Sequence, residues 1–171
     1  MPAIDLVGVT IGPGSFTGLR VGVTTAKTLA YVLKCQVIGV NTLDVIAHQA
    51  PAAIASVKVI VDAQRKQLFA GVYQRDAAGR MVEHQTTGIV DRDAWLRSLN
   101  TGDAVTGPAL SKLESDLPSG VQLVDNALWE PTAASVGAVA ADLFTAGQRD
   151  DFWKLVPLYF RPSAAEEKLM K

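Results

Sequence analysis

Residues 6–40 read LVGVTIGPGSFTGLRVGVTTAKTLAYVLKCQVIGV, and this stretch decides the fold class. Its first six residues are mostly apolar and β-branched, which predicts a strand covered on both faces. Glycines break that run, and a helix is then expected from an N-cap at Ser15 or Thr17 to about Lys34. The last five residues predict a second apolar strand. A β-α-β crossover almost always places two parallel strands in one sheet, so the sequence predicts an α/β protein.

The pattern changes downstream, where apolar runs separated by polar turns predict an antiparallel meander. A helix near the end of the chain is expected to open at Pro131 and to stop at Gly147. We therefore divide the chain into two lobes, residues 1–55 and 56–171, hinged near residues 51–56. The elements expected in the second lobe are strands at 57–61, 67–73, 81–90, 104–106 and 121–124, and helices at 91–99, 111–117 and 131–147.

The predicted first lobe is thin. A strand covered on both faces needs neighbours in its sheet, yet residues 1–55 supply one partner strand and two helices, the second capped by Thr42. A sheet of two strands is only marginally stable by itself. We expect either that further residues once preceded Met1 or that a partner chain covers this lobe.

Composition narrows the class of protein. With 171 residues, of which 49% are apolar and 19% charged, the chain fits a globular protein that buries a core. The formal net charge of -1 provides no overall attraction to nucleic acid. Cys35 is the only cysteine, and the sequence has neither the pattern of a signal peptide nor that of a membrane-spanning helix. We therefore expect a cytoplasmic protein without disulfides or membrane contact.

The turn that contains Gly12, Gly14 and Ser15 lies between a strand and a helix, where free backbone N–H groups can hold an anion. It differs from the familiar motifs of this kind. The third glycine comes one place late for a dinucleotide fingerprint, and Leu19 stands where a P-loop has lysine. Ser15 also lacks the flanking glycines of a nucleophile elbow. We expect Ser15 to cap the helix, and we keep the turn as a candidate anion site.

The helix after this turn carries few charges. Between residues 15 and 33 only Arg20 and Lys27 are charged, and Gly18 and Gly22 lie four residues apart. Mid-helix glycine costs roughly 0.5–1 kcal/mol relative to alanine, which close approach of another helix would offset. The helix either packs tightly on its own sheet or presents one face to a second chain, and we favour the second alternative. The residues predicted at this interface are Gly18, Val21, Gly22, Thr25, Ala26 and Leu29.

Catalytic and metal sites have less support. The two histidines, His48 and His84, lie in different lobes and neither has a second ligand at helical spacing, so we expect no metal site. Asp62 ends a strand beside Arg65 and Lys66, which suits either a phosphate-facing loop or a polar hairpin turn. We expect the turn.

The run GPGSFTGLRVG at residues 12–22 resembles the TsaB (YeaZ) family of tRNA threonylcarbamoyladenosine biosynthesis proteins. Residues 61–65 (VDAQR) are similar to the family's Asp-Ala-Arg segment at a strand end, and residues 131–144 and 156–161 are similar in kind. The resemblance covers most of the chain and is loose between residues 75 and 125.

This resemblance implies an actin/Hsp70-like fold, the ASKHA or ribonuclease H-like class, with two lobes and here an incomplete first lobe. Family members resemble the catalytic subunit TsaD without its metal-binding histidines. They form homodimers, or heterodimers with TsaD, through helices such as residues 15–33. The resemblance thus implies a non-catalytic subunit that supports threonylcarbamoyl transfer to an adenosine beside the tRNA anticodon. A TsaE-type ATPase joins the assembly, and we expect tRNA, ATP and ADP to be bound only within it.

The chain departs from the family at its start, because family members begin with a hairpin and a helix that have no counterpart before Leu6. Their absence puts nucleotide binding between the lobes and the usual dimer geometry in question. The alternative function is an ATP-dependent phosphotransferase or ATPase of the same fold, acting through the glycine turn and Asp62. A zinc peptidase or a serine hydrolase would need ligands or a catalytic base that the sequence does not offer.

Overall fold

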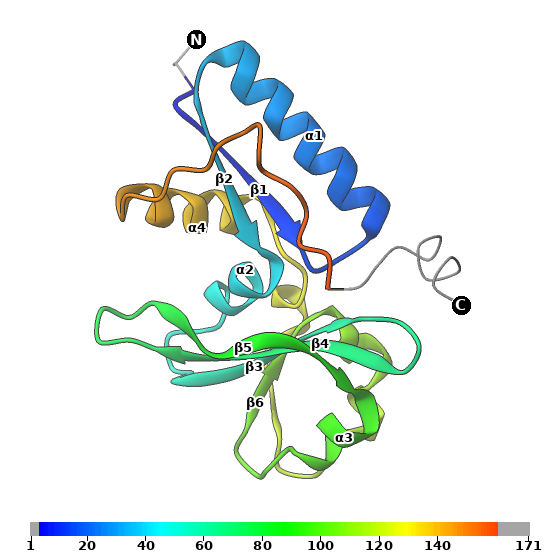
Figure 1. Ribbon diagram of the computed structural model, residues 1–171. Helices are drawn as coiled ribbons and strands as arrows, with labels where there is room; N and C mark the ends of the chain where they lie inside the picture. The colour runs from blue at the N-terminus through cyan, green and yellow to red at the C-terminus, as the bar shows by residue number, and fades with distance from the viewer. Residues whose placement is uncertain (1–3, 161–171) are drawn as a thin grey trace.

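The computed structural model describes residues 4–160, and within them the chain forms two lobes, each with its own sheet (Figure 1). The first sheet pairs β1 with β2, and the second has the strand order β5-β4-β3-β6-β7. The predicted α/β class and the β-α-β opening are confirmed. The elements are β1 (Leu6–Gly12), α1 (Phe16–Leu33), β2 (Gln36–Asn41), α2 (Thr42–His48), β3 (Ser56–Asp62), β4 (Gln67–Arg75), β5 (Met81–Asp91), α3 (Arg92–Arg97), β6 (Ala104–Thr106), β7 (Gln122–Leu123) and α4 (Ala133–Thr145).

The opening unit, β1-α1-β2, follows from local signals in the sequence. Ser15 is the N-cap of α1, and its Oγ accepts a hydrogen bond from Gly18 N–H at 3.3 Å, as predicted. The helix ends where Lys34 adopts a left-handed backbone conformation with φ 55°. β1 and β2 then run parallel, with Val9 opposite Gly39.

α2 connects the first sheet to the core of the second. Its N-cap is Asn41, whose side-chain oxygen accepts a hydrogen bond from Leu43 N–H at 2.8 Å, and not Thr42. The difference arises because Asn41 ends β2 in an extended conformation, the backbone geometry of an N-cap, whereas Thr42 is already helical. Ile46 and Leu43 are fully buried and pack in one cluster with Tyr73 of β4.

The second sheet combines a meander with parallel strands. β3, β4 and β5 are antiparallel, as expected, whereas β6 and β7 run parallel to β3 on its other side. Alternate residues of β3 enter two cores, Val59 with α2 and Ile60 with Trp95 of α3. The helix expected at residues 111–117 is instead two short 3-10 turns, Pro108–Lys112 and Glu114–Asp116.

The chain returns to the first sheet after the second lobe. α4 packs its apolar stripe, which includes Val136 and Leu143, with Ile38 of β2, on the face opposite α1 (Figure 1). It begins after the N-cap Thr132, so Pro131 precedes the helix instead of opening it.

Residues 150–160, called here the C-terminal strap, then run beside α1 (Figure 1). Leu155 of the strap packs in the cluster that joins α1 to β2. α4 and the strap, residues 133–160, thus pack on the first sheet. The sequence-based division instead assigned them to a second lobe of residues 56–171. Chain order alone does not show which sheet a later helix covers.

Candidate partner surface

α1 rests on the first sheet through one stripe of its surface. Leu19, Val23, Ala26 and Ala30 are buried, and the last three pack with Val37 of β2. Their spacing follows one face of a helix. The rest of the helix surface therefore contacts the strap or solvent.

The two charged side chains of α1 turn toward the strap. Arg20 Nε donates a hydrogen bond to Tyr159 Oη at 3.1 Å, and its guanidinium lies 4.4 Å from the centroid of the Phe16 ring. Lys27 Nζ donates to Trp153 O at 3.3 Å and to Leu155 O at 3.1 Å. Arg20 and Lys27 are the only charged residues of α1, and both face the strap. The opposite side of the helix therefore carries no charged residue.

Apolar side chains are exposed on and beside this uncharged side. Val21 is 62% exposed, Val32 68% and Trp153 of the strap 71%, and Leu29 and Tyr31 are also exposed. Aromatic rings continue the surface from helix to strap, because Tyr31 and Trp153 have centroids 6.1 Å apart. Exposed apolar side chains gathered on one element and its neighbour favour an interaction surface.

The residues predicted at the interface divide between two sides of α1. Val21, Thr25, Leu29 and Gly18 are exposed, and Gly22 is half-buried. Ala26, however, is only 4% exposed and faces the first sheet. Each four-residue step advances 40° around a helix, so Ala26 lies 80° from Gly18 and leaves the outer face.

Sequence reasoning missed the contribution of the strap. Phe152 and Trp153 form an aromatic pair between the charged residues Asp151 and Lys154. Tyr31 contacts both rings, with centroid distances of 6.0 and 6.1 Å. That aromatic pair was the available signal, but nothing in the sequence showed that the chain returns to α1.

The glycine turn borders a hollow of about 330 Å³ between the lobes. Gly14 and Ser15 line it from the first lobe, and Val61, Pro108 and Glu130 line it from the second lobe and the segment before α4. Gly12 lies beside this turn, where Leu158 O of the strap is 3.1 Å from the position of a Cβ. The only charged side chain among the lining residues is the carboxylate of Glu130, so the hollow brings no cation to a phosphate.

Asp62 is held by neighbouring groups. Its Oδ2 contacts Lys112 Nζ at 2.7 Å, and its Oδ1 accepts a hydrogen bond from Gln64 N–H at 2.7 Å. The bond from Lys112 lowers the pKa of this carboxyl. Asp62 thus organises the turn after β3, as a polar hairpin turn requires.

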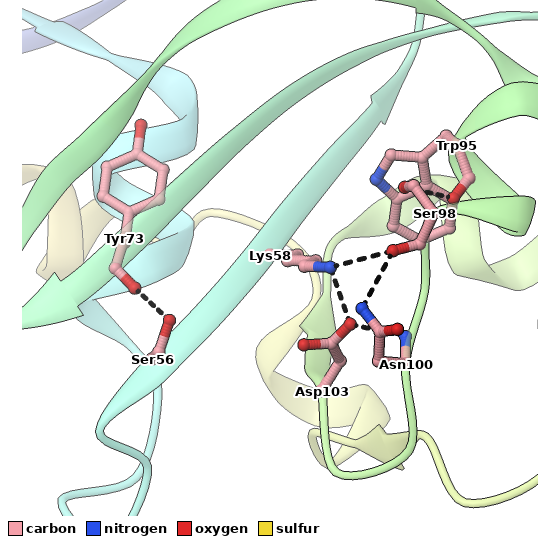
Figure 2. Close-up of polar contacts among 7 residues, drawn as sticks. All are labelled: Ser56, Lys58, Tyr73, Trp95, Ser98, Asn100 and Asp103. Carbon is pink, nitrogen blue, oxygen red and sulfur yellow. Dashed lines mark hydrogen bonds and ion pairs between the residues drawn. The ribbon is translucent and has the colours of Figure 1, made fainter.

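A second polar cluster lies near α3 in the second lobe (Figure 2). Lys58 Nζ of β3 lies 2.6 Å from Asp103 Oδ2, and Asn100 N–H donates to the same oxygen at 2.7 Å. Lys58 Nζ also reaches Ser98 O at 3.5 Å. The hydrogen bond from Lys58, followed by that from Asn100, lowers the pKa of Asp103. These groups satisfy one another, so we assign the cluster a structural role in joining β3 to the loop after α3.

Residues 4–160 contain neither a metal-binding cluster nor a membrane-spanning helix. No group of three or more histidine, cysteine, aspartate or glutamate side chains there could hold a metal ion. No helix in that part of the chain combines the length and apolar character needed to cross a membrane.

Comparison with known proteins gives a consistent result. Residues 1–120 match the family described as TsaD, tRNA N6-adenosine threonylcarbamoyltransferase. The chain is 32% identical over 174 residues to the tRNA threonylcarbamoyladenosine biosynthesis protein TsaB of Bacillus subtilis (strain 168), covering 96% of this chain and 73% of the relative. It is 29% identical to the protein of the same name from Escherichia coli (strain K12), covering 92% and 71%.

A solved structure supports the same fold. An uncharacterised protein from Pseudomonas aeruginosa with similarity to peptidase YeaZ superposes with a TM-score of 0.77 at 21% sequence identity. The match covers 93% of this chain and 74% of the other. The actin/Hsp70-like, two-lobed fold expected from the resemblance is confirmed.

Proposed function

This chain belongs to the TsaB family of tRNA threonylcarbamoyladenosine biosynthesis proteins, and we propose that it acts as a non-catalytic partner subunit of a TsaD-type transferase. In this role it supports threonylcarbamoyl transfer to the adenosine next to the tRNA anticodon, while the TsaD-type subunit carries the chemistry. The observation that carries the proposal is the uncharged, apolar outer side of α1 with its exposed Val21 and Leu29.

The partner surface consists of the outer side of α1 and the exposed ring of Trp153. Gly18 and Gly22 lack side chains there, which lets a helix of the partner approach the backbone of α1 closely. Trp153 and Tyr31 supply the large aromatic contacts that dominate the energy of protein interfaces. When no transferase is present, the same surface joins two copies of this chain.

The glycine turn and Asp62 serve structure in this proposal. Ser15 Oγ accepts the capping hydrogen bond of α1, and Lys112 holds Asp62. The inter-lobe hollow offers Glu130 to a ligand and no cation. ATP or ADP is therefore bound only where partners, including a TsaE-type ATPase, supply positive charge. A net charge of -1 likewise suits a subunit that meets tRNA through its complex.

The test is size-exclusion chromatography with light scattering of this chain mixed with the TsaD-type protein of the same organism. We expect a stable heterodimer that Leu29→Glu and Val21→Glu each weaken at least tenfold, because a buried unpaired carboxylate costs more than 1.4 kcal/mol. Val82→Glu, on the exposed part of β5, is the matched control and leaves the complex intact. A complex unaffected by both α1 variants would contradict the proposed surface.

The alternative, an ATP-dependent phosphotransferase or ATPase, predicts magnesium-dependent ATP binding by the isolated chain in the 330 Å³ hollow. Isothermal titration of the isolated chain with MgATP separates the two proposals. We expect no binding heat, and a dissociation constant in the micromolar range would favour the enzyme.

A further inference from the structure

The inter-lobe hollow contains a buried hydroxyl without a partner. Thr42, the first residue of α2, lines this hollow of about 330 Å³ and is only 8% exposed. Its Oγ1 is buried and has no hydrogen-bond partner among the described residues. Buried polar atoms of folded proteins nearly always have such a partner. The Thr42 hydroxyl therefore indicates that a polar group of a bound molecule completes the hollow.

The segment before α4 gives the hollow a negative charge. Glu130 is the only charged residue that lines it, and no described residue forms a hydrogen bond or an ion pair with the Glu130 carboxylate. The backbone at this point is fixed, because Gln49 Nε2 donates to Glu130 O and to Leu128 O, both at 2.9 Å. The carboxylate is thus held beside the hollow and is available to a cationic group.

The start of α1 gives the hollow a positive end. Gly14 and Ser15 line it, and the N-terminus of an 18-residue helix carries a partial positive charge. The first two N–H groups of α1, on Phe16 and Thr17, have no acceptor among the described residues. Ser15 Oγ accepts a hydrogen bond from Gly18 N–H and can still donate its own proton. These donors suit a carboxylate.

The two ends of the hollow together select the charge of a ligand. A phosphate at the start of α1 would bring its negative charge toward Glu130, with no lining cation to balance it. A cation alone would meet the positive end of α1. A molecule with one carboxylate and one ammonium group satisfies both ends. The walls between the ends include Leu19 from one lobe and Val61 from the other, and these apolar side chains strengthen such interactions by excluding water.

We propose that this hollow binds a small zwitterion, a free α-amino acid with a polar side chain. Its carboxylate lies at the start of α1, its ammonium group at Glu130, and its side chain forms a hydrogen bond with Thr42 Oγ1. The volume of about 330 Å³ is at the lower end of the range for small-molecule sites, roughly 300–1,000 Å³. The inference goes beyond the proposed function and does not depend on it, because Val21 and Leu29 do not line the hollow.

Isothermal titration of the full-length chain with L-serine and three matched molecules tests the ligand class. Ethanolamine lacks the carboxylate of serine, 3-hydroxypropanoate lacks its ammonium group, and L-alanine lacks its hydroxyl. We expect L-serine to bind, and ethanolamine and 3-hydroxypropanoate to bind at least tenfold more weakly, because each loses a charge-assisted hydrogen bond. L-Alanine should bind at least threefold more weakly, since it leaves the Thr42 hydroxyl without a partner.

Glu130→Gln tests the ammonium end of the site. We expect this variant to bind L-serine at least tenfold more weakly than the wild type and to bind it no better than 3-hydroxypropanoate. Glu114→Gln is the matched control, because Glu114 is exposed in the 3-10 turn Glu114–Asp116 and does not line the hollow. Its affinity for L-serine should equal that of the wild type. Both glutamates are exposed, so neither change disturbs a core.

Two buried hydroxyls separate ligand binding from stability. Thr106 is 1% exposed and its Oγ1 also lacks a partner among the described residues, but Thr106 does not line the hollow. Thr42→Val and Thr106→Val each replace an unpaired hydroxyl by a methyl group, so both should raise the Tm of the ligand-free chain. Only Thr42→Val should make L-serine bind no better than L-alanine.

The outcomes separate this inference from the proposed function. No binding heat from L-serine, or equal affinities for L-serine and 3-hydroxypropanoate, would overturn the zwitterion site. An equal loss of affinity in Thr42→Val and Thr106→Val would overturn it too. The complex with the TsaD-type protein should survive Glu130→Gln, and Leu29→Glu should leave L-serine binding unchanged. Either proposal can therefore fail while the other stands.

Discussion

Tyr73 Oη of β4 donates a hydrogen bond to Asp44 Oδ1 of α2 over 2.7 Å, and this bond joins the helix that follows the first sheet to the core of the second lobe. Tyr73 is among the largest fully buried side chains. Burial raises the pKa of Asp44, the bond from Tyr73 opposes that rise, and the charge of Glu83 adds to it. The pKa of Tyr73 is also raised, mainly by burial, so its hydroxyl stays the donor.

The raised pKa of Asp44 predicts a pH dependence of stability. A carboxyl whose pKa is higher in the folded protein stabilises the fold below its unfolded value, and that contribution is lost as pH rises through the folded value. Asp44→Asn removes this loss, since an amide oxygen can still accept the bond from Tyr73. We expect the Tm of Asp44→Asn to exceed that of the wild type by a few degrees at pH 7, with the difference shrinking toward pH 4.

Tyr73→Phe is the companion variant. It removes the bond that opposes the rise in the pKa of Asp44, so its Tm should fall further below the wild type at pH 7 than at pH 4. Thermal denaturation at both pH values measures the two differences. Parallel shifts at both values would show that Asp44 does not titrate in the folded protein as its surroundings predict.

Local signals predicted the fold of the first 60 residues well, because each element there is decided by its own sequence. The apolar runs at β1 and β2 and the cap at Ser15 are short-range features. The choice of Asn41 over Thr42 as a cap depended on where β2 ends, and sequence patterns place such boundaries least reliably.

The candidate surface was predicted less completely, because part of it comes from the end of the chain. The spacing of Gly18 and Gly22 indicated a contact side on α1, but Ala26 turned out to be buried because the inward stripe drifts around the helix. Trp153 reaches this surface only because the strap packs on α1. The spacing of apolar residues in the sequence gives no sign of that tertiary contact.

The ion pair between Lys58 and Asp103 should contribute measurably to stability, since the two side chains are only 21% and 25% exposed. Lys58→Met leaves Asp103 bonded to Asn100 without its cation and is expected to cost roughly 1–2 kcal/mol in the free energy of unfolding. Lys154→Met is the control, because Lys154 is 85% exposed and lies 3.7 Å from Asp151. Its cost should stay under about 0.5 kcal/mol in urea denaturation.

Acid denaturation gives an independent check on the same pair. The lowered pKa of Asp103 contributes stability that is present above its ordinary value of 3.8 and is lost as pH falls through the folded value. Lys58→Met should therefore lose less stability than the wild type between pH 4 and the acid transition. An identical acid slope in both proteins would contradict the assignment.

Gly22→Leu is expected to disrupt association more than folding. The new Cβ would lie 3.8 Å from Val9 Cγ2, an ordinary contact. The rest of the side chain would occupy the space that the proposed partner helix needs beside α1. We expect at least a tenfold weaker dimer in light scattering, with the Tm unchanged or raised. Gly137→Leu in α4 is the matched control, since its added Cβ meets nothing within 4 Å and helix propensity favours the change. An unchanged oligomeric state in Gly22→Leu would remove this side of α1 from the interface.

Lys27 should hold the strap in place. Its Nζ donates hydrogen bonds to Trp153 O and Leu155 O. Lys27→Met removes this donor from both carbonyls. Hydrogen bonds from charged groups contribute roughly 1.5–3 kcal/mol, so local opening of the strap should become at least tenfold more frequent. The amide of Leu158, which donates to Ile11 O at 2.7 Å, reports this opening by hydrogen exchange.

The same variant should weaken binding of the TsaD-type protein, because Trp153 would no longer be positioned beside Tyr31. Lys34→Met, an exposed lysine at the end of the same helix, is the control for loss of charge. Faster hydrogen exchange of the Leu158 amide with unchanged binding of the TsaD-type protein would have a clear meaning. Lys27 would then hold the strap in place, but the strap would lie outside the interface. Unchanged exchange would mean that the ring contacts around Phe16 and Tyr159 hold the strap without the lysine.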